Sequence, residues 1–274
     1  MLFKLLGFFT LLFLFPLSAE ESAEITWYGH AAFKIKTAQG QVILIDPWIN
    51  NPSNPNGQQD LENLDKVDFI LITHGHDDHI GNAVEIAERT KAHLVATYDL
   101  GNALVKYQNY PAEHANEERF GNFGGKIPLD NGNIIVHFIP AVHSSSVVSK
   151  IDGNIMYGGN PGGFLIEMKN GPTVYHTGDT DLFSDMKLIP KIKYVDVMLV
   201  CIGGVYTMDP HTAAQAVKWV RPKIAVPMHF GTFQALTGTP KQFNEEMLRL
   251  GAPAKMRLLK LGAPLLFKQN GSVK

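Results

Sequence analysis

The sequence contains a single cysteine, Cys201, so the chain cannot form an internal disulfide bond. Burial of apolar side chains must therefore stabilise the folded protein by itself. Hydrophobic residues make up 45% of the 274 positions, which is enough for one large core, since single domains of roughly 200 to 250 residues are common. We therefore expect one folded domain.

The chain also lacks an excess of positive charge. Lys and Arg number 24 against 26 Asp and Glu, which gives a formal net charge of −2 at pH 7. Binding to DNA or RNA relies on clustered basic side chains that neutralise phosphates. The charge balance therefore disfavours a nucleic-acid partner, and we expect a small-molecule substrate instead.

The N-terminus carries an apolar run that is too short for a membrane-spanning helix. Residues 5–15 are mostly apolar and follow the single charge of this region, Lys4. A spanning helix needs about 20 apolar residues, whereas a shorter run with a basic start and a small-residue end is typical of a secretory signal peptide. We predict a signal peptide over residues 1–19 and an exported domain, periplasmic or secreted, over residues 20–274. Because Leu17 is larger than the small residue preferred near a cleavage site, an uncleaved leader that anchors the protein to a membrane is the alternative.

Strand and helix patterns alternate along the rest of the chain. Runs rich in β-branched and aromatic residues predict strands, and periodic segments after Asp-Pro or Thr-Pro pairs predict helices. The expected strands are residues 25–35, 41–45, 69–73, 93–97, 134–139, 164–168, 173–176, 195–200, 223–227 and 256–261, and the expected helices are residues 81–89, 212–220 and 242–250. Because the early strands follow one another as hairpins and the later ones alternate with helices, we predict a layered α/β sandwich.

A cluster of metal-binding side chains follows one of the apolar strand runs. Its sequence is His74-Gly75-His76-Asp77-Asp78-His79. Alternation in an extended turn places His74 and His76 on one side, and Asp78 and His79 follow at the bend, so two neighbouring cations could each receive ligands. A purely structural explanation, in which an Asp caps the following helix, leaves three clustered histidines unexplained.

Three further candidate ligands also stand directly after apolar strand runs. His143 follows residues 134–139, Asp179 follows residues 173–176, and His229 follows residues 223–227. Open α/β sheets gather ligands at the edge where their strands end. The remaining histidines that lack this placement are expected to have structural roles, namely His93, His114, His137 and His211.

The pattern formed by these residues resembles the metal-binding motifs of the metallo-β-lactamase superfamily. The resemblance spans residues 25–266, and it implies a four-layer αββα sandwich with the metals at one edge of its two sheets. Residues 178–181 and 224–231 look most like the small metal-dependent hydrolases related to the L-ascorbate-6-phosphate lactonase. The ligand sets that the resemblance implies are His74, His76 and His143 for one ion, Asp78, His79 and His229 for the other, and Asp179 as a bridge between both.

Two divalent ions are the cofactors that this ligand set predicts. Imidazole and carboxylate ligands without thiolate favour zinc, while manganese, iron, nickel and cobalt accept the same donors. Cys201 lies within an apolar strand run, so we predict a buried structural thiol rather than a ligand.

These cofactors predict a metal-dependent hydrolase acting on an ester or lactone of a small molecule. Two dications that share a water lower its pKa, so that a metal-bound hydroxide is available near neutral pH. Asp78 would be the catalytic residue that orients this hydroxide, and His30, Tyr206 and Phe230 are candidate substrate contacts. A phosphodiesterase of the same fold and a non-catalytic metal-binding protein of the cell envelope are the alternatives.

Overall fold

The computed structural model describes residues 22–269 and 272–273. The leader predicted over residues 1–19 lies outside this part of the chain. Within it, no helix is both long enough and apolar enough to cross a membrane.

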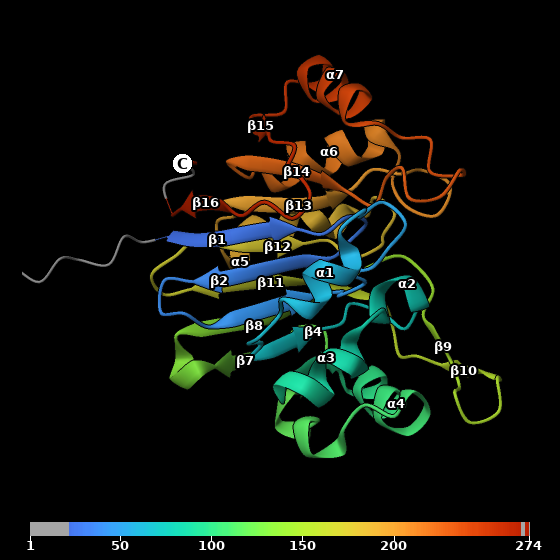
Figure 1. Cartoon of the computed structure of the whole chain (residues 1–274). Coiled ribbons are helices and arrows are strands. Elements are labelled where there is room, and N and C mark those ends of the chain that lie inside the picture. The colour runs from blue at the N-terminus through green and yellow to red at the C-terminus, as the bar shows by residue number, and fades with distance from the viewer. Residues whose placement is uncertain (1–21, 270–271, 274) are drawn as a thin grey trace, which may run out of the picture.

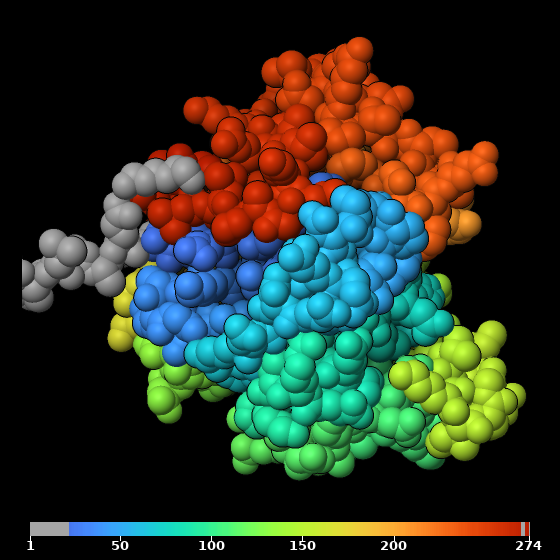
Figure 2. Space-filling model, viewed as in Figure 1, coloured from blue at the N-terminus to red at the C-terminus, as the bar shows by residue number. Residues whose placement is uncertain are grey.

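Two seven-stranded sheets form the centre of the structure (Figure 1). The first sheet has the strand order β16-β1-β2-β3-β4-β5-β6. Its strands are β1 (Ser22–Trp27), β2 (Phe33–Thr37), β3 (Val42–Ile45), β4 (Phe69–Leu71), β5 (His93–Thr97), β6 (Phe120–Gly121) and β16 (Leu265–Lys268). Because β16 pairs with β1, the C-terminal segment, red in Figure 2, lies against the blue N-terminal strands.

The second sheet has the order β15-β14-β13-β12-β11-β8-β7. Its strands are β7 (Lys126–Leu129), β8 (Ile134–Pro140), β11 (Gly162–Met168), β12 (Val174–His176), β13 (Val197–Cys201), β14 (Ile224–Met228) and β15 (Lys255–Met256). A separate hairpin of β9 (Ser146–Val148) and β10 (Ile155–Tyr157) projects from the body of the molecule in yellow-green in Figure 2.

Helices form the two outer layers. The α-helices are α1 (Gly57–Glu62), α2 (Asp77–Ile80), α3 (Ala83–Thr90), α4 (Tyr98–Gln108), α5 (Ile189–Ile192), α6 (Pro210–Val220) and α7 (Pro240–Leu250), and the short 3₁₀ turns are η1 (Ala112–His114), η2 (Glu117–Arg119), η3 (Asp130–Gly132) and η4 (Ser184–Leu188). Apolar side chains of α1, α3 and α4 pack on the first sheet. Those of α6 and α7 belong to the core that includes the second sheet. The order helix, sheet, sheet, helix confirms the predicted four-layer sandwich.

The alternation of side chains along β4 explains the layering. Phe69 and Leu71 face the core shared by the two sheets, whereas Ile70 between them faces the helices, as the two-residue period of a strand requires. Each side chain of this size that is removed from water stabilises the fold by about 1.5–3 kcal/mol. Strand β4, which the sequence predicted as part of residues 69–73, is therefore covered on both faces.

The predicted elements differ from the observed ones in a few places. The single strand expected over residues 25–35 is two antiparallel strands, β1 and β2, because Gly29 and His30 have φ angles of 96° and 48° and reverse the chain. The strand expected over residues 256–261 is reduced to the short β15. The sequence patterns did not predict helices α1, α2, α4 and α5, strands β6, β7 and β16, or the β9–β10 hairpin.

Strand direction decides where the site lies. Strands β12, β13 and β14 are parallel, and β8 runs in the same direction as β12 because both are antiparallel to β11. In the first sheet β3 and β4 are parallel. The residues that follow β8, β12 and β14 therefore emerge at a common edge of the second sheet.

Candidate metal centre

The seven predicted metal ligands lie together where these strands end. They form three overlapping groups in which the donor atoms are within 4.8 Å of one another. The groups are His74, His76 and His143; His74, His79 and Asp179; and His30, Asp78, His79 and His229. The first and third groups correspond to the two ligand sets expected from the sequence, and His30 is an added member of the third. Asp179 belongs to the second group, which shares His74 with the first and His79 with the third.

The first group is built on the turn between β4 and α2. His74 Nε2 lies 2.9 Å from His76 Nδ1, and the Gly75 amide donates to Ser145 Oγ at 3.0 Å. A side chain at Gly75 would place its Cβ 2.7 Å from the Ser146 carbonyl oxygen, so only glycine allows the turn to pack against β9. Burial lowers the pKa of His74 well below its usual value, which keeps the imidazole neutral as a metal ligand must be.

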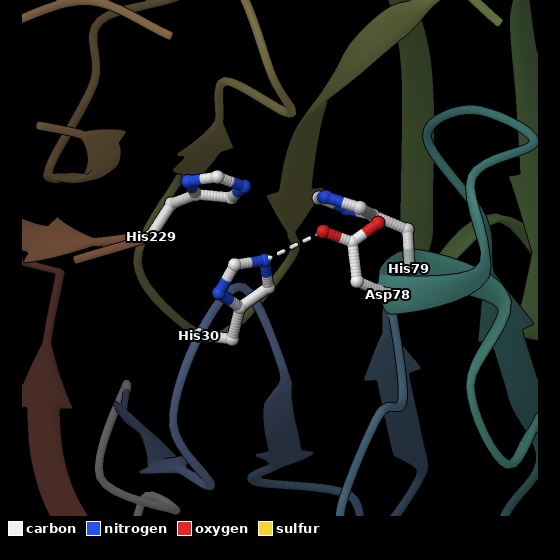
Figure 3. Close-up of side chains that lie close together, drawn as sticks. All are labelled: His30, Asp78, His79 and His229. Carbon is white, nitrogen blue, oxygen red and sulfur yellow. Dashed lines mark hydrogen bonds and ion pairs between the residues drawn. The ribbon is translucent and has the colours of Figure 1, made fainter. Parts of the chain in front are cut away.

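The second group brings together residues from both sheets (Figure 3). Asp78 and His79 lie in α2 after the first sheet, and His229 follows β14 of the second. The nitrogens of His79 and His229 and an Asp78 oxygen face a common space in Figure 3. Donor atoms on opposed segments that converge in this way can hold a cation between them.

Asp179 lies between the two groups. Its Oδ2 atom is 2.9 Å from His229 Nε2, 3.4 Å from His79 Nε2 and 3.8 Å from His143 Nε2. The preceding Gly178 has φ of 60°, and a Cβ there would clash with the Gly162 carbonyl. Burial alone would raise the pKa of Asp179, but His229 and His79 outweigh it and hold that pKa well below the usual range.

Several buried side-chain atoms of the site make no contact with hydrogen-bond geometry, even where an oppositely charged atom is close. Among the described residues these include His79 Nε2, His229 Nε2 and Asp179 Oδ1. A buried polar atom without a partner is costly, and a cation that accepts the three lone pairs would remove this cost. The residues present therefore fit a divalent metal with nitrogen and oxygen ligands.

Asp46 is a residue beside the donor groups that the sequence analysis missed. It is fully buried, its Oδ2 atom lies 2.7 Å from His79 Nδ1, and it accepts hydrogen bonds from the Thr73 amide and hydroxyl at 2.8 and 2.7 Å. A carboxylate on the far nitrogen of a ligating histidine fixes the ring and its tautomer. Asp46 follows β3 directly, so the strand-end rule that found the other carboxylates would have found it too.

The three candidate substrate contacts have different environments. His30 is fully buried, Tyr206 is 56% exposed in the loop after β13, and the Phe230 ring packs against Trp27 with centroids 5.4 Å apart. Burial lowers the pKa of His30 to about 4. A direct contact with substrate stays a prediction for all three.

The histidines expected to be structural lie outside the three donor groups. His137 pairs with Glu167 at 2.6 Å and His211 pairs with Glu246 at 2.8 Å. The rings of His93 and His114 contact each other. Within the described residues, the donor groups contain none of these four.

Comparison with known proteins identifies the family. The sequence model of a family described as beta-lactamase superfamily domain matches residues 24–229. The chain belongs to the metallo-β-lactamase superfamily. Within that superfamily it is 54% identical over 260 residues to a UPF0173 metal-dependent hydrolase of Thermodesulfovibrio yellowstonii, covering 94% of this chain and 97% of the relative. A UPF0173 metal-dependent hydrolase of Archaeoglobus fulgidus is 40% identical and is covered over its full length.

Two solved structures of hydrolases have the same fold as this chain. Igni18, a metallo hydrolase from Ignicoccus hospitalis, aligns with a TM-score of 0.74 at 34% identity and covers 90% of this chain and 99% of its own. An isothiocyanate hydrolase from Delia radicum gut bacteria aligns with a TM-score of 0.65 at 16% identity, over 90% of this chain and 99% of its own. The first supports the family as well as the fold, and the second supports the fold alone.

Cys201 lies in the core at the end of β13, and burial raises its pKa to about 11. Its Sγ atom is 3.6 Å from the Thr177 hydroxyl and the Thr180 carbonyl, and it belongs to none of the donor groups. We expect Cys201→Ala to retain the full metal content and to lower the free energy of unfolding by about 1 kcal/mol, because only a small buried group is lost. Elemental analysis and denaturant unfolding test this, and loss of metal would show that the thiol is a ligand.

Proposed function

We propose that the protein binds two divalent cations, zinc in the first place, and hydrolyses an ester or lactone of a small molecule. The observation that supports this most directly is the overlap of the three donor groups. His74 and His79 each belong to two of them, and Asp179 lies between the outer two. Two adjacent cations with a shared carboxylate fit this arrangement better than one closed four-ligand structural site, which usually uses cysteines.

When bound, a pair of cations supplies acidity that makes hydroxide available near neutral pH, and it polarises the oxygen under attack. Asp78 is the residue of this chain placed to direct the attacking water. Its side chain is 24% exposed, whereas that of Asp179 is 3% exposed. Burial alone would raise the pKa of Asp78, but the adjacent His30 and the nearby His79 hold it well below the usual range. Asp78 therefore stays ionised at neutral pH and can orient the attacking water by accepting a hydrogen bond from it.

The exposed members of the site indicate where substrate approaches. His74, His79 and His229 are buried, while Asp78, His76 and His143 are half-buried. The Ser144 hydroxyl lies 3.5 Å from His76 Nε2, so the loop that carries His143 also borders the opening. A small carbonyl compound entering here would meet Asp78 before it reached the buried ligands.

Activity assays on zinc-loaded protein test the proposal. We expect turnover of lactones or nitrophenyl carboxylic esters, loss of turnover after chelation of the metal, and recovery when zinc is returned. Chelated protein is the matched control, because its chain is unchanged. Turnover of nitrophenyl phosphodiesters alone would make the protein a phosphodiesterase, and two bound ions with no turnover of either class would favour a metal-binding protein.

A further inference from the structure

We propose that His30 is an additional ligand of the cation held by Asp78, His79 and His229. This inference rests on the proposed two-cation site. The seven ligands expected from the sequence do not include His30, which is fully buried and so is poorly placed to contact a substrate.

The positions of the donor atoms support direct ligation. His30 Nε2 belongs with the donor atoms of Asp78, His79 and His229 to one group spanning no more than 4.8 Å, and the four side chains face a common space in Figure 3. His30 Nε2 lies 3.1 Å from Asp78 Oδ2. Two atoms that each lie 2.0–2.1 Å from one zinc ion are about 2.9–3.4 Å apart. The contact therefore has the spacing of two ligands on one cation.

The other ring nitrogen of His30 contacts a threonine hydroxyl, as does that of the expected ligand His74. His30 Nδ1 lies 3.0 Å from Thr232 Oγ1, and His74 Nδ1 lies 3.0 Å from Thr73 Oγ1. The Thr232 hydroxyl also accepts a hydrogen bond from Ser53 Oγ at 3.0 Å. A ligating histidine generally engages an oxygen through the nitrogen that does not face the metal. This arrangement leaves His30 Nε2 available to a cation.

The backbone holds the rings of His30 and His229 close together. Both residues have positive φ angles, 48° and 55°, which non-glycine residues rarely adopt and which are retained mainly at functional sites. The His229 amide donates to the His30 carbonyl at 3.0 Å, and their ring centroids are 3.9 Å apart. The β1–β2 turn, which interrupts what reads as one strand, thus brings an imidazole to the metal centre.

The alternative is that His30 donates a hydrogen bond to Asp78 and only positions it. His30→Gln separates the two roles, because the glutamine amide can donate to a carboxylate but replaces the imidazole nitrogen that favours zinc. His93→Gln is the matched control, since His93 lies outside the donor groups. Circular dichroism would first establish that each variant is folded.

Zinc titration against a chromophoric chelator measures the two affinities separately. We expect His30→Gln to keep the first affinity and to weaken the second by more than about 100-fold, which exceeds the 10-fold to 100-fold cost of losing an outer partner, and to change the visible spectrum of the cobalt-loaded protein. Unchanged affinities and an unchanged cobalt spectrum would overturn the inference and leave His30 as a positioning residue. Fewer than two ions in the unmodified protein would instead contradict the proposed function.

Thr232→Val provides a second test if His30→Gln does not fold. It keeps the His30 imidazole and removes the hydroxyl beside Nδ1. We expect the second zinc affinity to fall by about 10-fold or more, with recovery in Thr232→Ser. An unchanged affinity in Thr232→Val would overturn the inference.

Discussion

Replacing His74 and His76 together by alanine is expected to leave at most about one bound ion per chain and to reduce kcat/KM by about 1000-fold or more. His74 and His76 are two of the three histidines of the first donor group, so their loss removes most of the ligands proposed for one cation. Metal ions stabilise the charge of a hydrolytic transition state by several kcal/mol, and about 1.4 kcal/mol corresponds to a tenfold change in rate. Elemental analysis and steady-state kinetics on purified protein measure the two effects.

The double variant His137→Ala/His211→Ala is the matched control for this prediction. Both residues are paired with glutamates away from the metal centre, so we expect a metal content equal to that of the unmodified protein. Two ions retained in His74→Ala/His76→Ala would contradict the ligand assignment.

Asp46→Asn is expected to lower the metal affinity by about 10-fold to 100-fold, the usual cost of losing the oxygen partner of a ligating histidine. Asparagine keeps the size of the side chain but removes the charge that faces His79 Nδ1 at 2.7 Å. It can also turn its amide group toward the ring, which would favour the wrong tautomer. Zinc titration measures the affinity, and activity at saturating zinc shows whether added metal rescues the variant.

Asp196→Asn is the matched control for Asp46→Asn, because it also removes the charge of a buried carboxylate. Asp196 is also buried and accepts a hydrogen bond from the Thr173 amide at 2.8 Å, but it precedes β13 and so lies at the other end of the strand. We expect this variant to be less stable and to bind zinc normally. Equal losses of affinity in both variants would indicate a general effect on folding.

The ends of the predicted strands indicated the cluster of expected ligands, and the resemblance to the metallo-β-lactamase superfamily added the four-layer sandwich. His143, Asp179 and His229 come after apolar runs, and parallel strand directions bring such positions to one edge. The turn at Gly29 and His30 was not predictable in the same way, because apolar residues continue through Ala31 and Ala32, which are also buried. Only the positive φ angles reveal the reversal.

Two of the other missed elements, α4 and the β9–β10 hairpin, were not predicted for different physical reasons. Helix α4 contains Gly101, and glycine in a helix interior costs about 1 kcal/mol. The segment therefore lacked a clear helical pattern in the sequence. In the structure the Phe120 ring packs against Gly101, where a larger side chain would not fit. Hairpin β9–β10 exposes Ile155 and Tyr157. A strand that buries few of its side chains shows no clear hydrophobic pattern in the sequence.

The origin of the site in both sheets also affects how the protein folds. Asp78 and His79 follow the first sheet, while Asp179 and His229 follow the second, far along the chain. A collapsed intermediate with only one sheet formed would hold an incomplete set of donors, so we expect tight uptake of the proposed metal ions to wait for the docking of the two sheets. The rate of metal uptake during refolding would therefore report the rate at which the two sheets dock. A metal-sensitive dye could follow this uptake in a stopped-flow experiment.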